Sequence, residues 1–231
     1  MTYTILDLFC GAGGAGYGYH LAGFDVTGVD IRNMKRYPFE FHRADALAYL
    51  DAVINYGPGW FGIDAIHASP PCQHWSRMSN CRPGLKDQYP QLIEPVRERL
   101  QAIGLPYVIE NVPGAPLKDP VILCGSSFGL GSHGLQIRRH RLFETSFHVP
   151  PLECRHSGYT MNPHAETGRQ RMRDAGFTEY SRPWTNAMGV PWMTTSRVDA
   201  EAREAIPPAY TEYVGLHLRY HLMEQGERLA A

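Results

Sequence analysis

The sequence lacks any long hydrophobic run. No apolar stretch among its 231 residues approaches the roughly 20 residues that span a bilayer. The first stretch, MTYTILDLF, also lacks the basic start and the small-residue cleavage site of a signal peptide. With 43% hydrophobic and 19% charged residues, the composition is that of a globular protein. We therefore expect a cytoplasmic protein without a membrane partner.

Cysteine and net charge are also scarce. The five cysteines are an odd number without a C-x-x-C pair, which argues against a disulfide framework and against a compact zinc ribbon. Cys154, His156 and His164 offer potential metal ligands, but their spacing is irregular, so the sequence predicts no metal site. A net charge of -1 excludes a uniformly basic chain, although a nucleic-acid enzyme can confine its basic residues to one face.

The order of apolar and amphipathic segments predicts an α/β fold with one principal domain. Four short apolar runs are typical of strands in a parallel sheet: residues 3–9, 25–31, 62–69 and 106–112. A helix is expected within residues 87–104, interrupted near its start by Pro95, and more β structure within residues 121–147. There is no internal repeat and no low-complexity tract.

Periodicity disappears between residues 148 and 188, where prolines, polar residues and aromatic residues are mixed. The sequence therefore predicts three parts: an α/β domain over residues 1–147, a loop-rich insertion over 148–188, and a segment over 189–231 that returns to the first domain. Apolar residues in the last part recur at every fourth position and predict a helix with one buried face: Tyr210, Val214, Leu218 and Leu222.

A glycine-rich loop follows the first predicted strand. In DLFCGAGGAG, the glycines at 11, 13 and 16 satisfy G-x-G-x-x-G, and Asp30 closes the second strand. Glycine lets the backbone approach a ligand, and a carboxylate at the next strand end can accept hydrogen bonds from ribose hydroxyls. The pattern favours a nucleoside-bearing cofactor, a nicotinamide dinucleotide included. Asp45 is suitable either for an adenine amino group or as a helix cap.

A cysteine stands on a rigid turn in HASPPCQHWS (67–76). Pro70 and Pro71 restrict the backbone at the carboxyl end of a predicted strand, where α/β enzymes place their sites, so Cys72 is a candidate nucleophile. The alternative, a small buried apolar residue, suits Cys10 and Cys124 better.

The strand PYVIENV (106–112) carries a carboxylate in an apolar run. Glu110 must be partnered or protonated if it is buried, and a carboxyl group with a raised pKa can serve as a general acid. A structural ion pair with an arginine of IRRHRLF (137–143) is the alternative.

Taken together, these motifs resemble the C5-cytosine DNA methyltransferase family. DLFCGAGG, PPCQ, ENV and RRHRLF occur in the family's order from Leu6 to about Phe143, and the tail AIPPAYTEYVG is similar to its last motif. The resemblance implies a Rossmann-like S-adenosylmethionine-dependent methyltransferase sheet with a small target-recognition insertion. It also implies a cytosine flipped out of double-stranded DNA as substrate. We expect a monomer.

The resemblance also implies roles for individual residues. Cys72 would attack C6 of the cytosine, Glu110 would hold the N3 and N4 edge, and Arg141 would bind O2 with help from Arg139. The residues that would bind the cofactor are Phe9, Cys10, Gly11, Ala12, Gly13, Gly14, Asp30, Ile31, Asp45 and Pro70.

Basic residues concentrate toward the predicted insertion. Residues 136–173 contain seven arginines and three glutamates, which favours contact with phosphates. The predicted DNA contacts are Gln73 and Ser76 on the cysteine loop and Arg169, Arg171 and Arg173 in the insertion. Because the insertion is short, we expect a short recognition sequence or relaxed specificity.

The sequence departs from the family at two places, and other functions stay open. Gln136 is displaced by one position relative to the arginines, and REAIPPAY stands where a Gly-Asn pair commonly precedes the last motif. The alternatives are an RNA (tRNA) cytosine-5 methyltransferase, a catalytically idle DNA-binding relative and, least favoured, a nicotinamide-dependent oxidoreductase.

Overall fold

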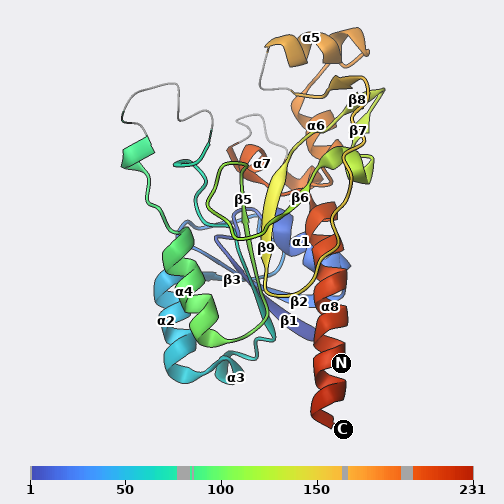
Figure 1. Cartoon of the computed structure of the whole chain (residues 1–231). Coiled ribbons are helices and arrows are strands. Elements are labelled where there is room, and N and C mark those ends of the chain that lie inside the picture. Colours follow the sequence, from blue (N-terminus) through green and yellow to red (C-terminus); the bar gives the residue numbers. More distant parts are fainter. Residues whose placement is uncertain (1, 77–83, 85, 163–165, 194–199, 231) are drawn as a thin grey trace.

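The computed structural model describes residues 2–76, 84, 86–162, 166–193 and 200–230. A seven-stranded sheet has the order β3-β2-β1-β4-β5-β9-β6 (Figure 1). The strands from β3 to β5 are parallel, whereas β9 runs antiparallel to both β5 and β6. Its strands are β1 (Tyr3–Leu8), β2 (Phe24–Asp30), β3 (Glu40–Arg43), β4 (Ala65–Ala68), β5 (Tyr107–Asn111), β6 (Val121–Leu123) and β9 (Arg141–Thr145).

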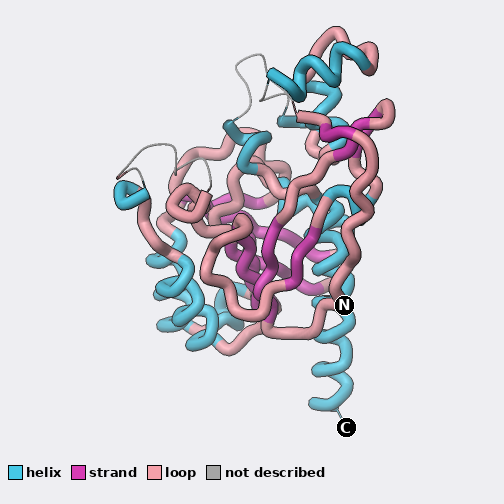
Figure 2. Tube along the Cα trace, turned by 45° about the horizontal axis from the view of Figure 1, so that its top comes forward, coloured by secondary structure: helices cyan, strands magenta, loops and turns pink. Residues whose placement is uncertain are grey.

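Helices cover both faces of this sheet, and a smaller sheet lies beyond one end. Figure 2 shows the strands at the centre with helices on either side. The α-helices are α1 (Gly14–Leu21), α2 (Ala46–Tyr56), α3 (Pro58–Phe61), α4 (Ile93–Ile103), α5 (Glu166–Asp174), α6 (Ser181–Ala187), α7 (Ala200–Glu204) and α8 (Pro208–Ala230). The small sheet has the order β10-β8-β7, with β7 (Gly131–Ser132), β8 (Leu135–Gln136) and β10 (Tyr159–Thr160). Short 3-10 helices are η2 (Lys86–Gln88), η3 (Gly125–Phe128) and η4 (Pro191–Met193).

Alternation along the strands explains why helices cover both faces. Successive side chains of β1 point to opposite faces, so Ile5 joins Tyr19 and Tyr210 in the core beneath α1 and α8. Leu6 joins Leu50 in a separate core beneath α2 and α4. Both faces of the parallel strands are therefore buried, as is usual for α/β proteins.

The predicted parallel strands and the predicted final helix are confirmed. The four positions assigned to the buried face of α8 are all less than 9% exposed. Pro95 lies in the first turn of α4, where no intrahelical N–H bond is lost, so the helix continues through it. The predicted loop-rich insertion contains helices α5 and α6, which the sequence did not predict. None of the described helices is long and apolar enough to cross a membrane.

Candidate active site

A cavity of about 340 Å³ opens at the edge of the sheet where β1, β2, β4 and β5 end. This is the usual place for ligands in α/β proteins. Because β9 runs antiparallel to β5, its first residue lies at the same edge as the last residues of β5. The C-terminal segment closes another side. The lining residues fall within 9–15, 30–34, 69–73, 110–112, 141 and 201–206.

The loop after β1 presents its backbone to the cavity. Gly11 has a φ of 51°, in the left-handed region, and a Cβ built on it meets nothing within 4 Å. Its N–H donates to Oδ2 of Asp30 at 3.1 Å. Phe9 also has a positive φ, 57°, which is uncommon outside glycine, and its carbonyl accepts from Oγ of Ser69 at 3.3 Å. The loop is thus held by Asp30 and Ser69, with open space beside Gly11 where a side chain would lie.

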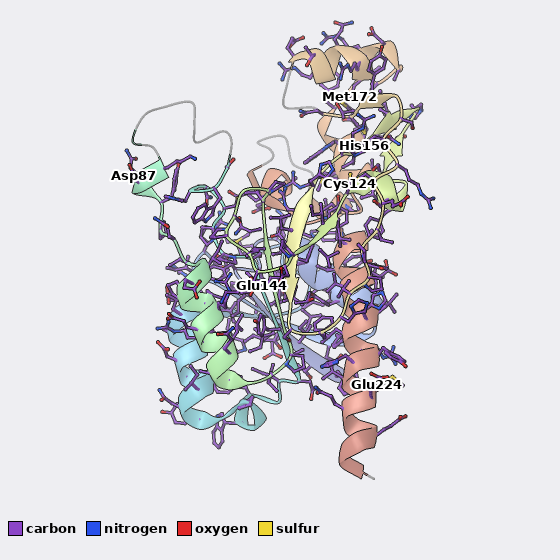
Figure 3. All side chains as sticks on the ribbon, viewed as in Figure 1. Asp87, Cys124, Glu144, His156, Met172 and Glu224 are labelled. Carbon is purple, nitrogen blue, oxygen red and sulfur yellow. The ribbon has the colours of Figure 1, made fainter. Side chains whose placement is uncertain are left out.

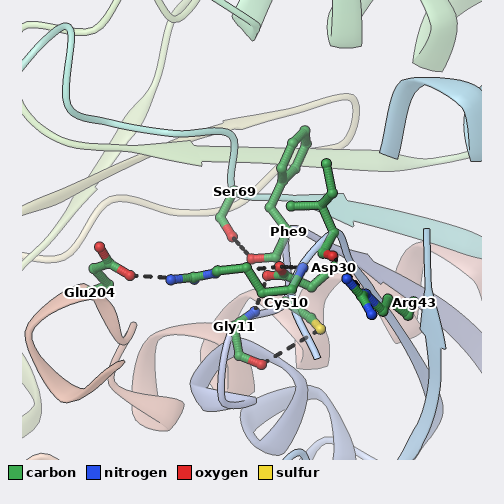
Figure 4. A network of polar contacts seen from close by, with 9 residues as sticks. Phe9, Cys10, Gly11, Asp30, Arg43, Ser69 and Glu204 are labelled. Carbon is green, nitrogen blue, oxygen red and sulfur yellow. Dashed lines mark hydrogen bonds and ion pairs between the residues drawn. The ribbon is translucent and has the colours of Figure 1, made fainter. Parts of the chain in front are cut away.

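Asp30 connects this loop to the mouth of the cavity (Figure 4). Its Oδ1 accepts from the backbone N–H of Arg32 at 2.8 Å, in addition to the bond from Gly11. The guanidinium of Arg32 lies 3.5 Å from the carboxylate of Glu204 in the C-terminal segment. A carboxylate offers about four acceptor sites, so Asp30 retains capacity for hydroxyl groups. Beside it, Ile31 is 64% exposed and offers an apolar surface.

A hydrogen bond from β5 holds the turn that carries Cys72. Nδ2 of Asn111 donates to the carbonyl of Pro70 at 2.9 Å, and both residues of this bond are buried. The carbonyl of Cys72 accepts from the N–H groups of Trp75 and Ser76, at 3.0 and 2.9 Å, which closes a tight turn after the cysteine. Cys72 is partly buried and lines the cavity. Burial raises the pKa of its thiol, an effect that the charge of Arg141 opposes.

Glu110 and Arg141 form an ion pair at the same end of the cavity. Nε of Arg141 lies 2.9 Å from Oε1 of Glu110, and both side chains are largely buried. The contact of Oε1 with Arg141 is an ion pair without hydrogen-bond geometry, and within the described residues this oxygen accepts no hydrogen bond. Burial raises the pKa of Glu110 even though Arg141 and Arg139 act in the opposite direction. The site therefore combines a thiol, a carboxyl group that favours its proton, and a guanidinium.

Comparison with known families identifies the chain. A family model described as C-5 cytosine-specific DNA methylase matches residues 3–119, just over half of the sequence. The chain belongs to this methylase family. The match contains the glycine loop, the Cys72 turn and Glu110, and it ends before β9 and the predicted insertion. No curated protein matches the sequence.

Two solved structures have the same fold as the methylase. Schizosaccharomyces pombe Dnmt2 methyltransferase aligns over 97% of this chain and 99% of its own, with a TM-score of 0.53 and 14% identity. The Entamoeba histolytica methyltransferase EhMeth aligns over the same shares, with a TM-score of 0.50 and 12% identity. A mutant of Spodoptera frugiperda DNMT2 aligns over 70% of this chain and 56% of its own, with 20% identity and a TM-score of 0.44.

The methylase cavity gathers most of the predicted cofactor residues. Eight of them line it: Phe9, Cys10, Gly11, Ala12, Gly14, Asp30, Ile31 and Pro70. Gly13 lies outside this lining, and a Cβ there would come within 2.7 Å of Pro38, so its small size serves packing. Asp45 also lies outside and is exposed. It is the N-cap of α2, where its carboxylate accepts from the N–H of Ala48 at 3.0 Å, so the structure places it in the helix-cap role.

Three of the four predicted catalytic residues line the cavity, and the fourth does not. Cys72, Glu110 and Arg141 line the cavity together with Gln73. Arg139 does not line it. Its backbone carbonyl accepts from the Tyr210 hydroxyl at 2.6 Å, and burial lowers its pKa to about 9, which leaves it charged at neutral pH. Its charge lowers the pKa of Glu110, against the effect of burial.

The insertion arginines predicted to contact DNA make interactions within their own part of the chain. Arg169 and Arg173 both pair with Glu166, at 2.6 and 2.9 Å. The guanidinium of Arg171 lies 4.7 Å from the centre of the Tyr159 ring. Ser76, the other predicted contact besides Gln73, is the last described residue before the gap at 77–83. These four assignments remain predictions.

Some lining residues were not assigned from the sequence. Glu204, Ala205 and Ile206 close the cavity beside the glycine loop, and a Cβ on Gly14 would overlap the carbonyl oxygen of Ile206. The tail motif was the available signal, but its departure from the family pattern gave no basis for assigning contacts. Arg32 also lines the cavity without any sequence signal.

Proposed function

We propose that this methylase transfers a methyl group from S-adenosylmethionine to C5 of a cytosine that has been flipped out of double-stranded DNA. The supporting observation is one cavity that is lined at one end by the glycine loop and Asp30 and at the other by Cys72, Glu110 and Arg141. The cofactor end and the nucleophile end are thus open to each other. The family to which the chain belongs is described as a DNA methylase, which supports the same substrate.

The cofactor end fits S-adenosylmethionine. The backbone at Gly11 is open, Asp30 retains acceptor capacity for ribose hydroxyls, and the exposed side chain of Ile31 can cover one face of an adenine. A volume of about 340 Å³ lies within the usual range for small-molecule sites. The bound cofactor would supply an electrophilic methyl group for C5.

The nucleophile end can perform addition to a pyrimidine. The Cys72 thiol loses its proton to solvent, and its Sγ forms a bond with C6 while the electron pair of the C5–C6 bond moves toward C5. Glu110, whose raised pKa favours the protonated form, donates a hydrogen bond at N3 and makes C6 more electrophilic. Arg141 stabilises the thiolate and is placed to bind O2. Once the methyl group is bonded to C5, the C5 proton passes to solvent, its electron pair restores the C5–C6 double bond, and the Sγ–C6 bond breaks to return the thiolate.

Duplex DNA containing 5-fluorocytosine tests this chemistry. Fluorine at C5 cannot leave as a proton does, so the Sγ–C6 bond persists after methyl transfer. We expect a covalent complex that requires S-adenosylmethionine, with the modified peptide containing Cys72 by mass spectrometry. Cys72→Ser is expected to form no complex while still binding S-adenosylmethionine in a calorimetric titration. A wild-type protein that binds the cofactor but forms no adduct, or an adduct that survives in Cys72→Ser, would refute the covalent mechanism.

The substrate is tested separately by competition between duplex DNA and tRNA for methyl transfer. We expect transfer to the duplex, and bisulfite sequencing of DNA from cells expressing the protein should then show the modified base and its sequence context. Preferential transfer to tRNA would overturn the DNA assignment while leaving the chemistry at Cys72 intact.

A further inference from the structure

Two cysteines and two histidines converge at the junction between the principal domain and the insertion. Cys124 stands at the start of η3, His140 precedes β9, and Cys154 and His156 lie in the first loop of the insertion. One ligand atom from each lies within 4.8 Å of the other three. Figure 3 shows Cys124 and His156 together above the end of the sheet.

Two of the distances match those between the ligands of a tetrahedral metal, and all four ligand atoms lie within 4.8 Å of one another. Sγ of Cys124 lies 3.3 Å from Nε2 of His156, and Sγ of Cys154 lies 3.4 Å from Nε2 of His140. With Zn–S bonds of about 2.3 Å and Zn–N bonds of about 2.0 Å, neighbouring ligand atoms in a tetrahedron are roughly 3.3–3.8 Å apart. The two imidazole rings are nearly perpendicular, with centroids 5.2 Å apart, and each Nε2 lies beside one of the two sulfur atoms.

The backbone around the ligands is ordered by hydrogen bonds that do not involve the four side chains. The N–H of Arg155, between the two outer ligands, donates to Oγ of Ser126 at 3.1 Å. Oγ of Ser127 donates to the carbonyl of Glu153 at 2.9 Å. The side chain of Gln136 donates to the Arg155 carbonyl at 3.0 Å and accepts from the N–H of Ser157 at 2.8 Å. Both loops are thus held in register, which lowers the entropy cost of assembling the site.

Hydrogen bonding alone does not account for the convergence. A thiol is a weak donor and a weak acceptor, and Cys154 and His156 are exposed, where water could satisfy them. We propose that Cys124, His140, Cys154 and His156 bind one structural Zn²⁺ ion. Two thiolates and two neutral imidazoles are a ligand set that Zn²⁺ prefers, and four protein ligands leave no open position for catalysis. Binding releases the two thiol protons to solvent.

The ion would connect the insertion to the chain segment that leads into β9 and carries Arg139 and Arg141. His140 lies between Arg139 and Arg141, and its carbonyl accepts from the Arg141 guanidinium at 3.0 Å. Our expectation of no metal site rested on Cys154 and His156 with His164, which lies outside the described residues. The other two ligands, Cys124 and His140, are 30 and 14 residues before Cys154. Only the fold brings the four side chains together.

The test is the metal content of the full chain, purified without a polyhistidine tag or a chelator and supplied with zinc during expression. Elemental mass spectrometry is expected to find one zinc per chain. Cys154→Ser and His156→Asn replace exposed ligands, so the fold should survive, and each is expected to lose most of the zinc. Matched controls outside the cluster, Cys72→Ser and His133→Asn, are expected to keep one zinc per chain. Cobalt substitution should give the visible bands and the thiolate charge-transfer band of a tetrahedral site, both absent in Cys154→Ser.

Thermal unfolding gives a second readout. Removing the metal from the wild-type protein with a chelator should lower its Tm by about 5–10 °C, and the two ligand variants should show no further decrease. A wild-type chain without zinc, zinc retained in both ligand variants, another metal in the site, or a Cys124–Cys154 disulfide in the freshly purified protein would each overturn the proposal.

Discussion

Asp7 is a carboxyl group buried beneath the glycine loop. It is 0% exposed, and its Oδ2 accepts from the Tyr37 hydroxyl at 3.1 Å. Burial is the main cause that raises its pKa from 3.8 to about 7, against the effect of hydrogen bonds from Tyr37 and the Gly16 backbone. A substantial part of the folded protein therefore carries a neutral carboxyl group here at neutral pH.

Replacing this carboxyl group should change how stability depends on pH. Because the pKa of Asp7 is higher in the folded state than in the unfolded state, its contribution to stability falls as pH rises from about 4 to about 7. The fall is up to about 1.4 kcal/mol for each pH unit. Asp7→Asn cannot ionise, so its free energy of unfolding relative to wild type should rise across this range and level off above about pH 8. Urea denaturation at several pH values measures the difference, with the exposed Asp25→Asn as control. A difference independent of pH would contradict the shifted pKa.

At the scale of elements, a buried ion pair joins α4 to β9. Nε and Nη2 of Arg97 donate to the two carboxylate oxygens of Glu144, both at 2.8 Å, and both side chains are almost fully buried. Nη2 also donates to the Pro116 carbonyl at 2.9 Å. Each charge is thus compensated in a region that water does not reach, and the pair positions the strand that begins with Arg141.

Breaking this pair should be costly. Glu144→Gln removes the buried counter-ion of Arg97 and leaves only the exposed carboxylate of Glu94 to pair with it, so we expect a loss of about 3–5 kcal/mol in the free energy of unfolding. The control is Asp51→Asn, which breaks the pair with Arg99 on the same helix. That pair is partly exposed, and its loss should cost less than about 1 kcal/mol. Equal costs for the two variants, measured by urea denaturation, would show that the buried pair contributes no more than a surface pair.

How far the sequence predicts an element depends on how local its determinants are. The buried face of α8 was predictable because four apolar residues recur at helical spacing and all face the core. Helix α5 was not, because only Gly168 and Met172 are buried and the rest of its surface is polar. Its helix is supported by pairs such as Glu166 with Arg169, three residues apart, which a sequence mixed with prolines does not distinguish from a loop.

The residues of the candidate active site also differ in how local their determinants are. Cys72 and Glu110 were predictable because a rigid turn and a buried carboxylate are unusual wherever they occur. The sequence position of Asp45 was compatible with two roles, binding an adenine amino group or capping a helix. The structure shows it as the N-cap of α2. The meeting of Cys124 with His140 depends on the path of the chain between η3 and β9, which no residue spacing reveals.

At the scale of the whole molecule, the end of the chain returns to support its beginning. Helix α8 packs along α1, and Oγ1 of Thr211 donates to the Ala15 carbonyl at 2.8 Å. Gly18 lies at the crossing, where the Pro208 carbonyl and the Thr211 hydroxyl occupy the space that a Cβ would need. Because α1 begins at the glycine loop, the contact with α8 also determines where that loop lies relative to Ala205 and Ile206.

Gly18→Ala has two opposite effects on the free energy of unfolding, through helix propensity and through packing. Alanine favours a helix over glycine by about 1 kcal/mol, but here a Cβ would overlap backbone atoms of α8 that cannot move without displacing the helix. We expect packing to prevail, with a net loss of about 1–3 kcal/mol in the free energy of unfolding and weaker binding of S-adenosylmethionine. Gly226→Ala is the matched control, since it lies in an exposed part of α8 with no atom within 4 Å of the added Cβ. That variant should gain up to about 1 kcal/mol and bind the cofactor as the wild type does. If Gly18→Ala were also more stable in urea denaturation, the contact between α1 and α8 could not be the tight crossing that holds the cofactor loop in place.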